Sequence, residues 1–165
     1  MSTEKFETSI KEGAHKQLLG LTGQWEGTTQ TWFEPDVLAD ESPMTGKITS
    51  ILDGRFILYE YKGSLQNKPF EGVAIYGFEL GEGKFKSAWI DSFHMGTGMM
   101  ISEGVKTEKN ISVLGSYGGP GMEKPWGWRT EFEWRNDELI IRAFNITPEG
   151  EEAKATETVY KRVHG

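Results

Sequence analysis

The 165-residue sequence contains no cysteine. This absence excludes disulfides, thiolate metal ligands and cysteine nucleophiles, and it favours a reducing compartment such as the cytoplasm. No stretch approaches the roughly 20 apolar residues of a membrane-spanning helix, and the N-terminus lacks the basic start and apolar run of a signal peptide. We therefore expect a cytoplasmic protein without a membrane partner.

Positive charge is also scarce and dispersed. The chain has 18 basic and 25 acidic residues, a formal net charge of −7. Because phosphate backbones are bound by concentrated positive charge, nucleic acid is not an expected partner. The spacings of phosphate loops, serine elbows and zinc sites are absent as well, so the sequence predicts neither a metal nor a cofactor.

Glycine and aromatic residues are abundant instead, with 21 Gly, 6 Trp, 9 Phe and 5 Tyr. This combination is typical of short strands joined by tight turns, where glycine supplies positive φ and aromatic rings fill a pleated surface. The length suits one domain with its own core. We expect a single domain over residues 1–165, with a helical segment at 1–22 and a barrel at 23–162.

The N-terminal segment has helical periodicity. Phe6, Ile10, Ala14 and Leu18 recur every four residues, which predicts a short amphipathic helix. Gly13 argues against an unbroken one.

From residue 23 onward the hydrophobic period is two. The predicted strands are 23–33, 44–52, 55–64, 69–80, 84–92, 96–106, 110–117, 126–136, 138–146 and 152–162. Short turns such as Asp53-Gly54 and Asn136-Asp137 make neighbouring strands antiparallel. About ten strands in an up-and-down order favour a closed barrel, which has no exposed edges, over the alternative of a two-sheet sandwich. Residues 34–43 and 117–127 are expected to be loops, either solvated connectors or flaps at the barrel mouth.

Charged residues indicate which side of each strand faces water. Lys84 and Lys86 facing outward place Trp89 and Asp91 inward, because side chains alternate along a strand. The same parity predicts further inward side chains: Trp25, Thr29, Phe33, Arg55, Ile57, Tyr59, Tyr61, Phe70, Gly72, Ala74, Tyr76, Phe78, Phe85, Ser87, Trp128, Thr130, Phe132 and Trp134. On the last strand, outward Lys154 would send Lys161 inward, so a bulge or an edge is expected there.

Polar groups in this interior suggest a binding site. Burying them without partners costs several kcal/mol, so they need one another, trapped water or a ligand. We expect a small apolar or amphipathic molecule, carrying a carboxylate in one version of the hypothesis, inside the barrel. The candidate ligand-binding residues are Arg55, Tyr59, Tyr76, Trp89, Asp91, Met99 and Trp128. Met99 belongs to a cluster with Met95 and Met100 that suits either a cavity or a core.

An enzyme is the alternative hypothesis. Asp91 in an apolar interior and His94 near it could exchange protons in acid–base chemistry or hydrolysis. Asp91 could equally cap a turn while His94 lies in water. A third hypothesis is an interaction or stress-related barrel whose interior is packed solid.

Three other features have weaker functional interpretations. Glu131 and Glu133 lie about 7 Å apart along a strand, as in inverting glycosidases, but their opposite neighbours are aromatic, which puts them outside. The acidic residues Asp36, Asp40 and Glu41 could ligate calcium, although a solvated loop is expected. The sequence is also compatible with a homodimer formed through an exposed strand or Trp32.

The sequence resembles the lipocalins and their calycin relatives. Gly23-Gln24-Trp25 after a helix is similar to their Gly-x-Trp start, and Tyr160-Lys161-Arg162 is similar to their closing strand. With His15-Lys16-Gln17-Leu18, Asp53-Gly54-Arg55-Phe56, Phe70-Glu71-Gly72, Tyr76-Gly77-Phe78 and Trp89-Ile90-Asp91-Ser92, the whole chain resembles a bacterial domain-of-unknown-function family with this barrel.

The resemblance implies a structural pair and two ligand classes. Arg162 would pack on Trp25, a cation–π contact of about 1 kcal/mol that closes the barrel. Intracellular relatives bind fatty acids through interior arginine and tyrosine, or bind haem. Haem needs an axial ligand, and none of His15, His94 and His164 lies clearly on an inward strand position, so haem is not expected.

Overall fold

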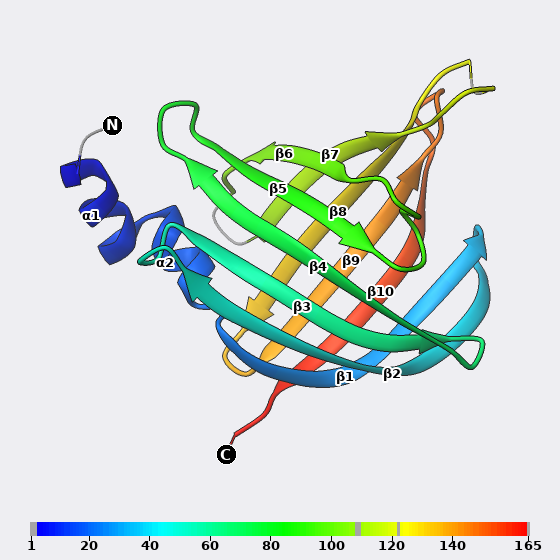
Figure 1. Ribbon diagram of the computed structural model, residues 1–165, viewed down its shortest axis with the longest axis horizontal. Coiled ribbons are helices and arrows are strands. Elements are labelled where there is room, and N and C mark those ends of the chain that lie inside the picture. Colours follow the sequence, from blue (N-terminus) through cyan, green and yellow to red (C-terminus); the bar gives the residue numbers. More distant parts are fainter. Residues whose placement is uncertain (1–2, 108–109, 122, 165) are drawn as a thin grey trace.

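The computed structural model describes residues 3–107, 110–121 and 123–164 as a β-barrel with two short helices at one end (Figure 1). The elements are α1 (Thr3–Glu12), α2 (Ala14–Leu19), β1 (Gly23–Glu34), β2 (Val37–Ile51), β3 (Phe56–Leu65), β4 (Lys68–Glu79), β5 (Lys84–Asp91), β6 (Met100–Val105), β7 (Asn110–Tyr117), β8 (Trp126–Arg135), β9 (Glu138–Ile146) and β10 (Glu152–Arg162).

The ten strands form one closed antiparallel barrel in which each strand pairs with the next and β1 pairs with β10. The predicted all-β, up-and-down barrel is confirmed, and the sandwich alternative is wrong. Closure pairs the backbone of both terminal strands, which would otherwise be exposed edges.

The N-terminal segment forms two helices because the chain breaks at Gly13. A Cβ atom at this position would lie 2.9 Å from the Ser9 Cα atom, so the corner is too tight for a side chain. His15 and Leu18 of α2 are buried, and α2 contacts β3 and β4 at the end of the barrel. Residues 1 and 2 of the predicted helical segment lie outside the described residues.

The predicted loop at 34–43 is mostly strand. Only Pro35 and Asp36 separate β1 from β2, and Asp36 adopts a φ of 62° in the turn. Asp40 and Glu41 pair with β1 within the sheet. The prolines and acidic residues concealed the period-two pattern, which is visible only from buried Ser42 onward.

The strand predicted at 96–106 is also shorter than expected, because β6 begins at Met100. Residues 92–99 instead connect β5 to β6 at the end of the barrel opposite the helices (Figure 1). Residues 118–125 connect β7 to β8 as predicted, with Met122 outside the described residues.

Most predicted inward positions are buried. They include Ile57, Tyr59, Tyr61, Ala74, Tyr76, Phe85, Ser87, Asp91, Trp128 and Phe132. Phe33 is an error, because its side chain is 56% exposed beyond the rim of the barrel. The predicted irregularity in the last strand is present as a register shift between Lys154 and Thr156, and it keeps Tyr160 inside.

The two ends of the barrel sequence meet at Trp25 and Arg162, which face each other across the β1–β10 pair. The Arg162 Cζ atom lies 4.3 Å from the centre of the Trp25 ring, the geometry that the resemblance implies. The Arg162 guanidinium also donates to the carbonyls of Gly20 and Thr22 and to Asp137. One side chain thus joins the last strand, the first strand and the end of α2.

Candidate functional site

A cavity of about 80 Å³ lies inside the barrel. It is in the half farther from the helices, since Leu65 at the end of β3 and Phe70 near the start of β4 both line it (Figure 1). Of the predicted ligand-binding residues, four line this cavity: Tyr59, Tyr76, Trp89 and Trp128.

One wall of the cavity is aromatic. The indoles of Trp89 and Trp128 stack with their centres 5.7 Å apart and their planes inclined by 20°. The Trp89 Nε1 donates to the Tyr61 hydroxyl over 2.7 Å, and the rings of Tyr59 and Tyr61 lie 5.0 Å apart. The hydrogen bond between β5 and β3 fixes the orientation of the Trp89 ring, so this wall is preformed.

The facing wall is built from threonines. It comprises Thr29, Thr31, Thr130, Thr156 and Thr158 from β1, β8 and β10. The hydroxyls of Thr29 and Thr158 lie 2.7 Å apart across the β1–β10 closure. Sequence reasoning placed only Thr29 and Thr130 inside. The alternation of Thr156, Thr158 and Tyr160 was a usable signal, but the bulge in β10 obscured its phase.

Several hydroxyl protons in the cavity remain available. Each hydroxyl has one proton to donate, so Tyr61, which accepts from Trp89, keeps its own. In the Tyr59–Tyr160 pair, 2.6 Å apart, one proton is used and one is left. The Tyr76 hydroxyl makes no hydrogen bond within the described part of the chain. Since no fully buried side-chain polar atom there lacks a partner, this hydroxyl opens onto the cavity that Tyr76 lines.

Burial keeps these phenols neutral. It raises the pKa of Tyr59, Tyr61, Tyr76 and Tyr160 far above the usual range, because a low-dielectric interior disfavours the phenolate. The cavity therefore presents hydrogen-bond donors without charge.

Asp91 and His94 form a pair at the mouth. Asp91 ends β5, and its carboxylate Oδ2 lies 2.6 Å from His94 Nδ1, while Oδ1 accepts from the Met95 amide at 2.7 Å. Burial favours the protonated acid, but the hydrogen bonds from His94 and Met95 outweigh it and lower the pKa of Asp91. With Nδ1 held by Asp91, the second ring nitrogen of His94 is left for other partners.

His94 is an exposed residue, as one sequence-based alternative proposed, but only 25% of its side-chain surface is open to solvent. It packs against Trp89 and Trp128 at 5.5 and 5.6 Å between ring centres, and it lines the cavity. Asp91 does cap the turn, as that alternative proposed. Sequence reasoning missed the contact of the His94 ring with the cavity lining, because His94 follows the end of a strand, where side chains no longer alternate between two faces.

Three predicted ligand-binding residues do not line the cavity: Arg55, Met99 and Asp91, of which Asp91 lines a separate hollow. Arg55 precedes β3 and donates to the Leu52 carbonyl, with its guanidinium 4.5 Å from the centre of the Phe6 ring. Leu52, Asp53 and Gly54 all have positive φ, so the turn extends past Gly54 and Arg55 never enters the strand. Met99 is 62% exposed, and Met100 is the methionine that packs on Trp128.

The carboxylates considered for other chemistry are engaged elsewhere. Glu131 pairs with Arg129, and Glu133 pairs with Arg142, on the outer face of β8, so the glycosidase interpretation is wrong. Asp40 accepts from Ser42 and from the Gln66 amide. In residues 3–107, 110–121 and 123–164 no group of three His, Asp or Glu residues could hold a metal.

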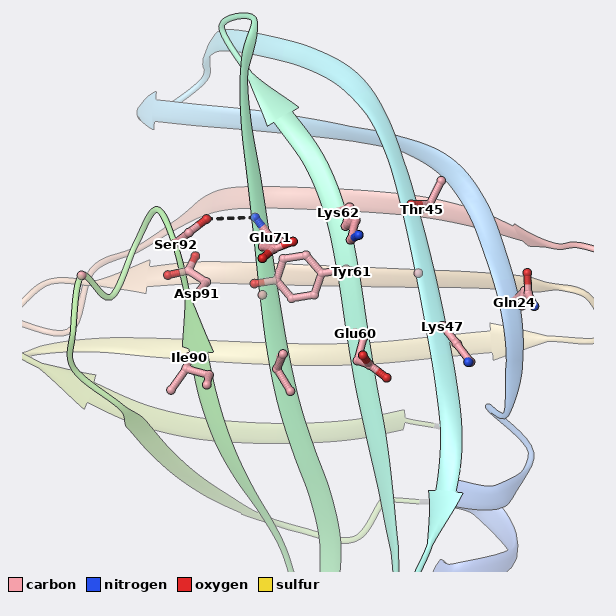
Figure 2. Close-up of a pocket in the computed structure, with 14 residues that line it drawn as sticks. Gln24, Thr45, Lys47, Glu60, Tyr61, Lys62, Glu71, Ile90, Asp91 and Ser92 are labelled. Carbon is pink, nitrogen blue, oxygen red and sulfur yellow. Dashed lines mark hydrogen bonds between the residues drawn. The ribbon is translucent and has the colours of Figure 1, made fainter.

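A hollow larger than the interior cavity lies over the wall of the barrel. It has a volume of about 860 Å³ over β2–β5, and Figure 2 shows Lys47, Glu60, Lys62 and Glu71 among its lining residues. These four side chains are exposed, although the buried residues Tyr61 and Asp91 also line this hollow. Because the stacked indoles and the tyrosine hydroxyls meet in the smaller interior cavity, we place the functional site there.

A second hollow of about 440 Å³ is formed at the rim of the barrel, where β1 and β9 end and β8 and β10 begin. Phe33, Trp126 and Asn145 in its lining are each two residues away from a cavity residue on β1, β8 and β9, namely Thr31, Trp128 and Ala143. Two residues along a strand correspond to about 7 Å, so this outer hollow lies one layer above the cavity.

A sequence model for a family described as protein of unknown function, DUF1579, matches residues 11–162. The chain belongs to the DUF1579 family. The predicted membership of a barrel family of unknown function is thereby confirmed. No curated protein matches the sequence.

A solved structure shares the fold of this DUF1579 chain. Rv2717c from M. tuberculosis has a TM-score of 0.62 at 14% identity, covering 90% of this chain and 96% of its own. A DUF3598 protein of unknown function from Nostoc punctiforme covers 92% and 100%, with a TM-score of 0.29 at 7% identity. The similarity to Rv2717c supports the barrel fold and says nothing about function. No helix of the described residues is long and apolar enough to cross a membrane.

Proposed function

We propose that the barrel binds one small, neutral, amphipathic molecule between the aromatic wall and the threonine wall of the interior cavity. The observation that carries this proposal is the set of unused hydroxyl donors, with Tyr76 as the clearest member, facing a space lined mainly by aromatic rings and threonines. Apolar cavities with a few convergent polar groups are the usual form of small-molecule sites. The absence of cysteine favours the cytoplasm as the place of binding.

The chemistry of the lining favours a ligand with an acceptor oxygen and no charge. The described lining residues include no lysine or arginine, so a carboxylate would be buried without a permanent counter-charge, at a cost of several kcal/mol. A ketone, ester, amide or ether oxygen would accept from Tyr61 or Tyr76 without that cost. With Arg55 outside, the carboxylate version of the hypothesis is dropped.

The size of the cavity limits the ligand. An apolar cavity of about 150 Å³ admits benzene, whereas this one measures about 80 Å³. A ligand of one ring therefore requires movement of His94 and the segment 92–99, or extension into the outer hollow. Haem is larger still and is not part of the proposal.

Three probes of similar size test whether the ligand needs an acceptor oxygen and must be uncharged: acetophenone, toluene and benzoate. Native mass spectrometry of the purified protein would first detect a ligand that it already carries, and tryptophan fluorescence would then follow titration with each probe. We expect acetophenone to quench Trp89 and Trp128, toluene to bind more weakly, and benzoate to bind least. The variant Tyr76→Phe should weaken acetophenone about fivefold to tenfold and leave toluene unchanged. The matched control Thr45→Val on the outer wall should change neither.

Equal binding of all three probes, or binding that Tyr76→Phe does not affect, would refute the proposed donor role. No binding of any probe and no carried ligand would refute the binding proposal as a whole and favour a solid core.

The Asp91–His94 pair supports a second candidate, an esterase-type hydrolase using the same cavity. A carboxylate on Nδ1 orients a histidine and fixes its tautomer, which suits the ring to take a proton from water through the other nitrogen. The 2.6 Å contact beside the cavity is the specific observation in its favour. His94→Gln and Asp91→Asn should each abolish turnover of small phenyl esters. Hydrolysis that persists in His94→Gln, or its absence in the wild type across such a panel, excludes this candidate.

A further inference from the structure

A third hollow, of about 500 Å³, lies beneath α1 at the helical end of the barrel. It is bounded by α1, α2, the turn before β3 and the end of β4 (Figure 1). It shares no lining residue with the interior cavity, so the two spaces are separate.

Two cations in this hollow have no acidic partner. Arg55 and Lys5 both line it, and neither forms an ion pair with any carboxylate of the described residues. The Arg55 Nη1 atom donates to the Leu52 carbonyl over 3.1 Å, which leaves most of its five N–H donors unused. Glu79, the carboxylate in the lining, lies 2.6 Å from Lys86, which also lines the hollow and pairs with Glu82 at 3.1 Å. The hollow therefore has a net positive charge in an otherwise acidic protein.

The remaining lining is apolar and aromatic. Phe6, Phe56, Phe78 and Leu80 contribute side chains from α1, β3 and the end of β4. Phe6 and Phe78 flank His15 edge-on, with ring centres 5.0 and 6.2 Å from it. A cationic rim over an apolar floor matches a molecule with an anionic head and a short apolar body.

His15 completes the floor of this hollow as a neutral group. Its Nδ1 atom lies 2.7 Å from the Ser9 hydroxyl. Burial, assisted by the positive charge of Arg55, lowers the pKa of His15. The free cations of the hollow are therefore Arg55, from the turn before β3, and Lys5, from α1.

We propose that this hollow is a second binding site, which takes a small organic anion with its head group on Arg55 and Lys5 and its apolar body against Phe56 and Phe78. The sequence predicted an anion-binding role for Arg55 inside the barrel. In the structure Arg55 lines this hollow instead. The hollow therefore has the positive charge for an anion that the interior cavity lacks.

The probe is octanoate, with 1-octanol as the neutral control of the same chain length. Binding is measured on the full chain by calorimetry and by backbone amide NMR. Octanoate should shift the amides of Gly77, Phe78 and Gly81 and leave the indole signals of Trp89 and Trp128 in place. Arg55→Met should weaken octanoate about tenfold or more, Lys5→Met several-fold, and neither should affect 1-octanol. Lys16→Met, a cation on α2 outside the lining, is the matched control and should bind as the wild type.

Arg55 also packs on Phe6, so its replacement could loosen α1. Arg55→Lys keeps the charge and should retain most of the octanoate affinity, whereas a purely packing role predicts the same loss in both variants. Octanoate affinity unchanged in the Arg55→Met, Lys5→Met double variant, or shifts confined to Trp89 and Trp128, would overturn the proposal. Because acetophenone reports on the indoles alone, failure at one site is distinguishable from failure at the other.

Discussion

Two tyrosines in the cavity wall differ in what their hydroxyls do. Tyr61 accepts from Trp89 and so holds one of the stacked indoles, whereas Tyr76 contacts the same space without a hydrogen bond to any described residue. Removing the acceptor leaves the partly buried Trp89 N–H unsatisfied, which costs more than removing a group that has no protein partner. The two hydroxyls should therefore separate stability from binding.

We predict that Tyr61→Phe lowers the free energy of unfolding by about 1–3 kcal/mol, because the Trp89 N–H loses its acceptor. Tyr76→Phe should change it by less than about 0.5 kcal/mol. Urea denaturation followed by far-UV circular dichroism measures both. Equal losses in the two variants would contradict the different hydrogen bonding of the two hydroxyls.

At the scale of elements, one arginine connects both ends of the chain. Arg162 on β10 covers the Trp25 ring of β1 and donates to the carbonyls that follow α2. Arg162→Met keeps the length of the side chain but removes the cation–π contact and these hydrogen bonds, so we expect a loss of about 2 kcal/mol. Lys161→Met, at the exposed neighbouring position, is the control and should be near neutral. Thermal unfolding of the pair checks the difference.

The docking of α2 should make stability depend on pH through His15. Its pKa in the folded state is below the unfolded value of 6.5, so the unfolded chain binds the proton first as the pH falls. This contribution to stability is therefore complete above about pH 6.5 and decreases from there toward the folded pKa. His15→Gln should be less stable near neutral pH but should lack this part of the decline. Chemical denaturation at a series of pH values measures it, and an identical slope in the variant would contradict the assignment.

The alternation of side chains along a strand predicted which residues face inward where charged residues alternate with aromatic ones. On β5, outward Lys84 and Lys86 placed Phe85 and Asp91 inside, as found. Parity failed where the chain leaves the strand: a turn with three consecutive positive-φ residues displaced Arg55, and His94 follows the end of β5. The cavity was thus only partly predictable, because its mouth is built by turns whose conformation depends on tertiary packing.

The whole molecule depends on a closure that joins its first and last strands. Every other strand pair links neighbours in sequence, but β1 pairs with β10 over seven matched residues, from Trp25 with Arg162 to Thr31 with Thr156. Such long-range pairing forms late and slowly, because the intervening chain must be ordered first. The threonine wall lies across the same closure, since Thr29 and Thr158 belong to its two strands.

Deleting residues 151–165 should therefore prevent folding of the whole barrel, and a stable nine-stranded sheet should not remain. The truncated sheet would expose the edges of β1 and β9 and would uncover the core around Trp25, so we expect insoluble protein or a loss of cooperative unfolding. Deleting only residues 164–165 is the control and should leave the unfolding transition intact, because β10 ends at Arg162. Adding a synthetic peptide of residues 151–163 to the truncated chain during refolding should restore Trp25 fluorescence, as strand addition to an open edge predicts. A truncated chain that unfolds cooperatively on its own would show that nine strands suffice and that closure by β10 is not what holds the barrel together.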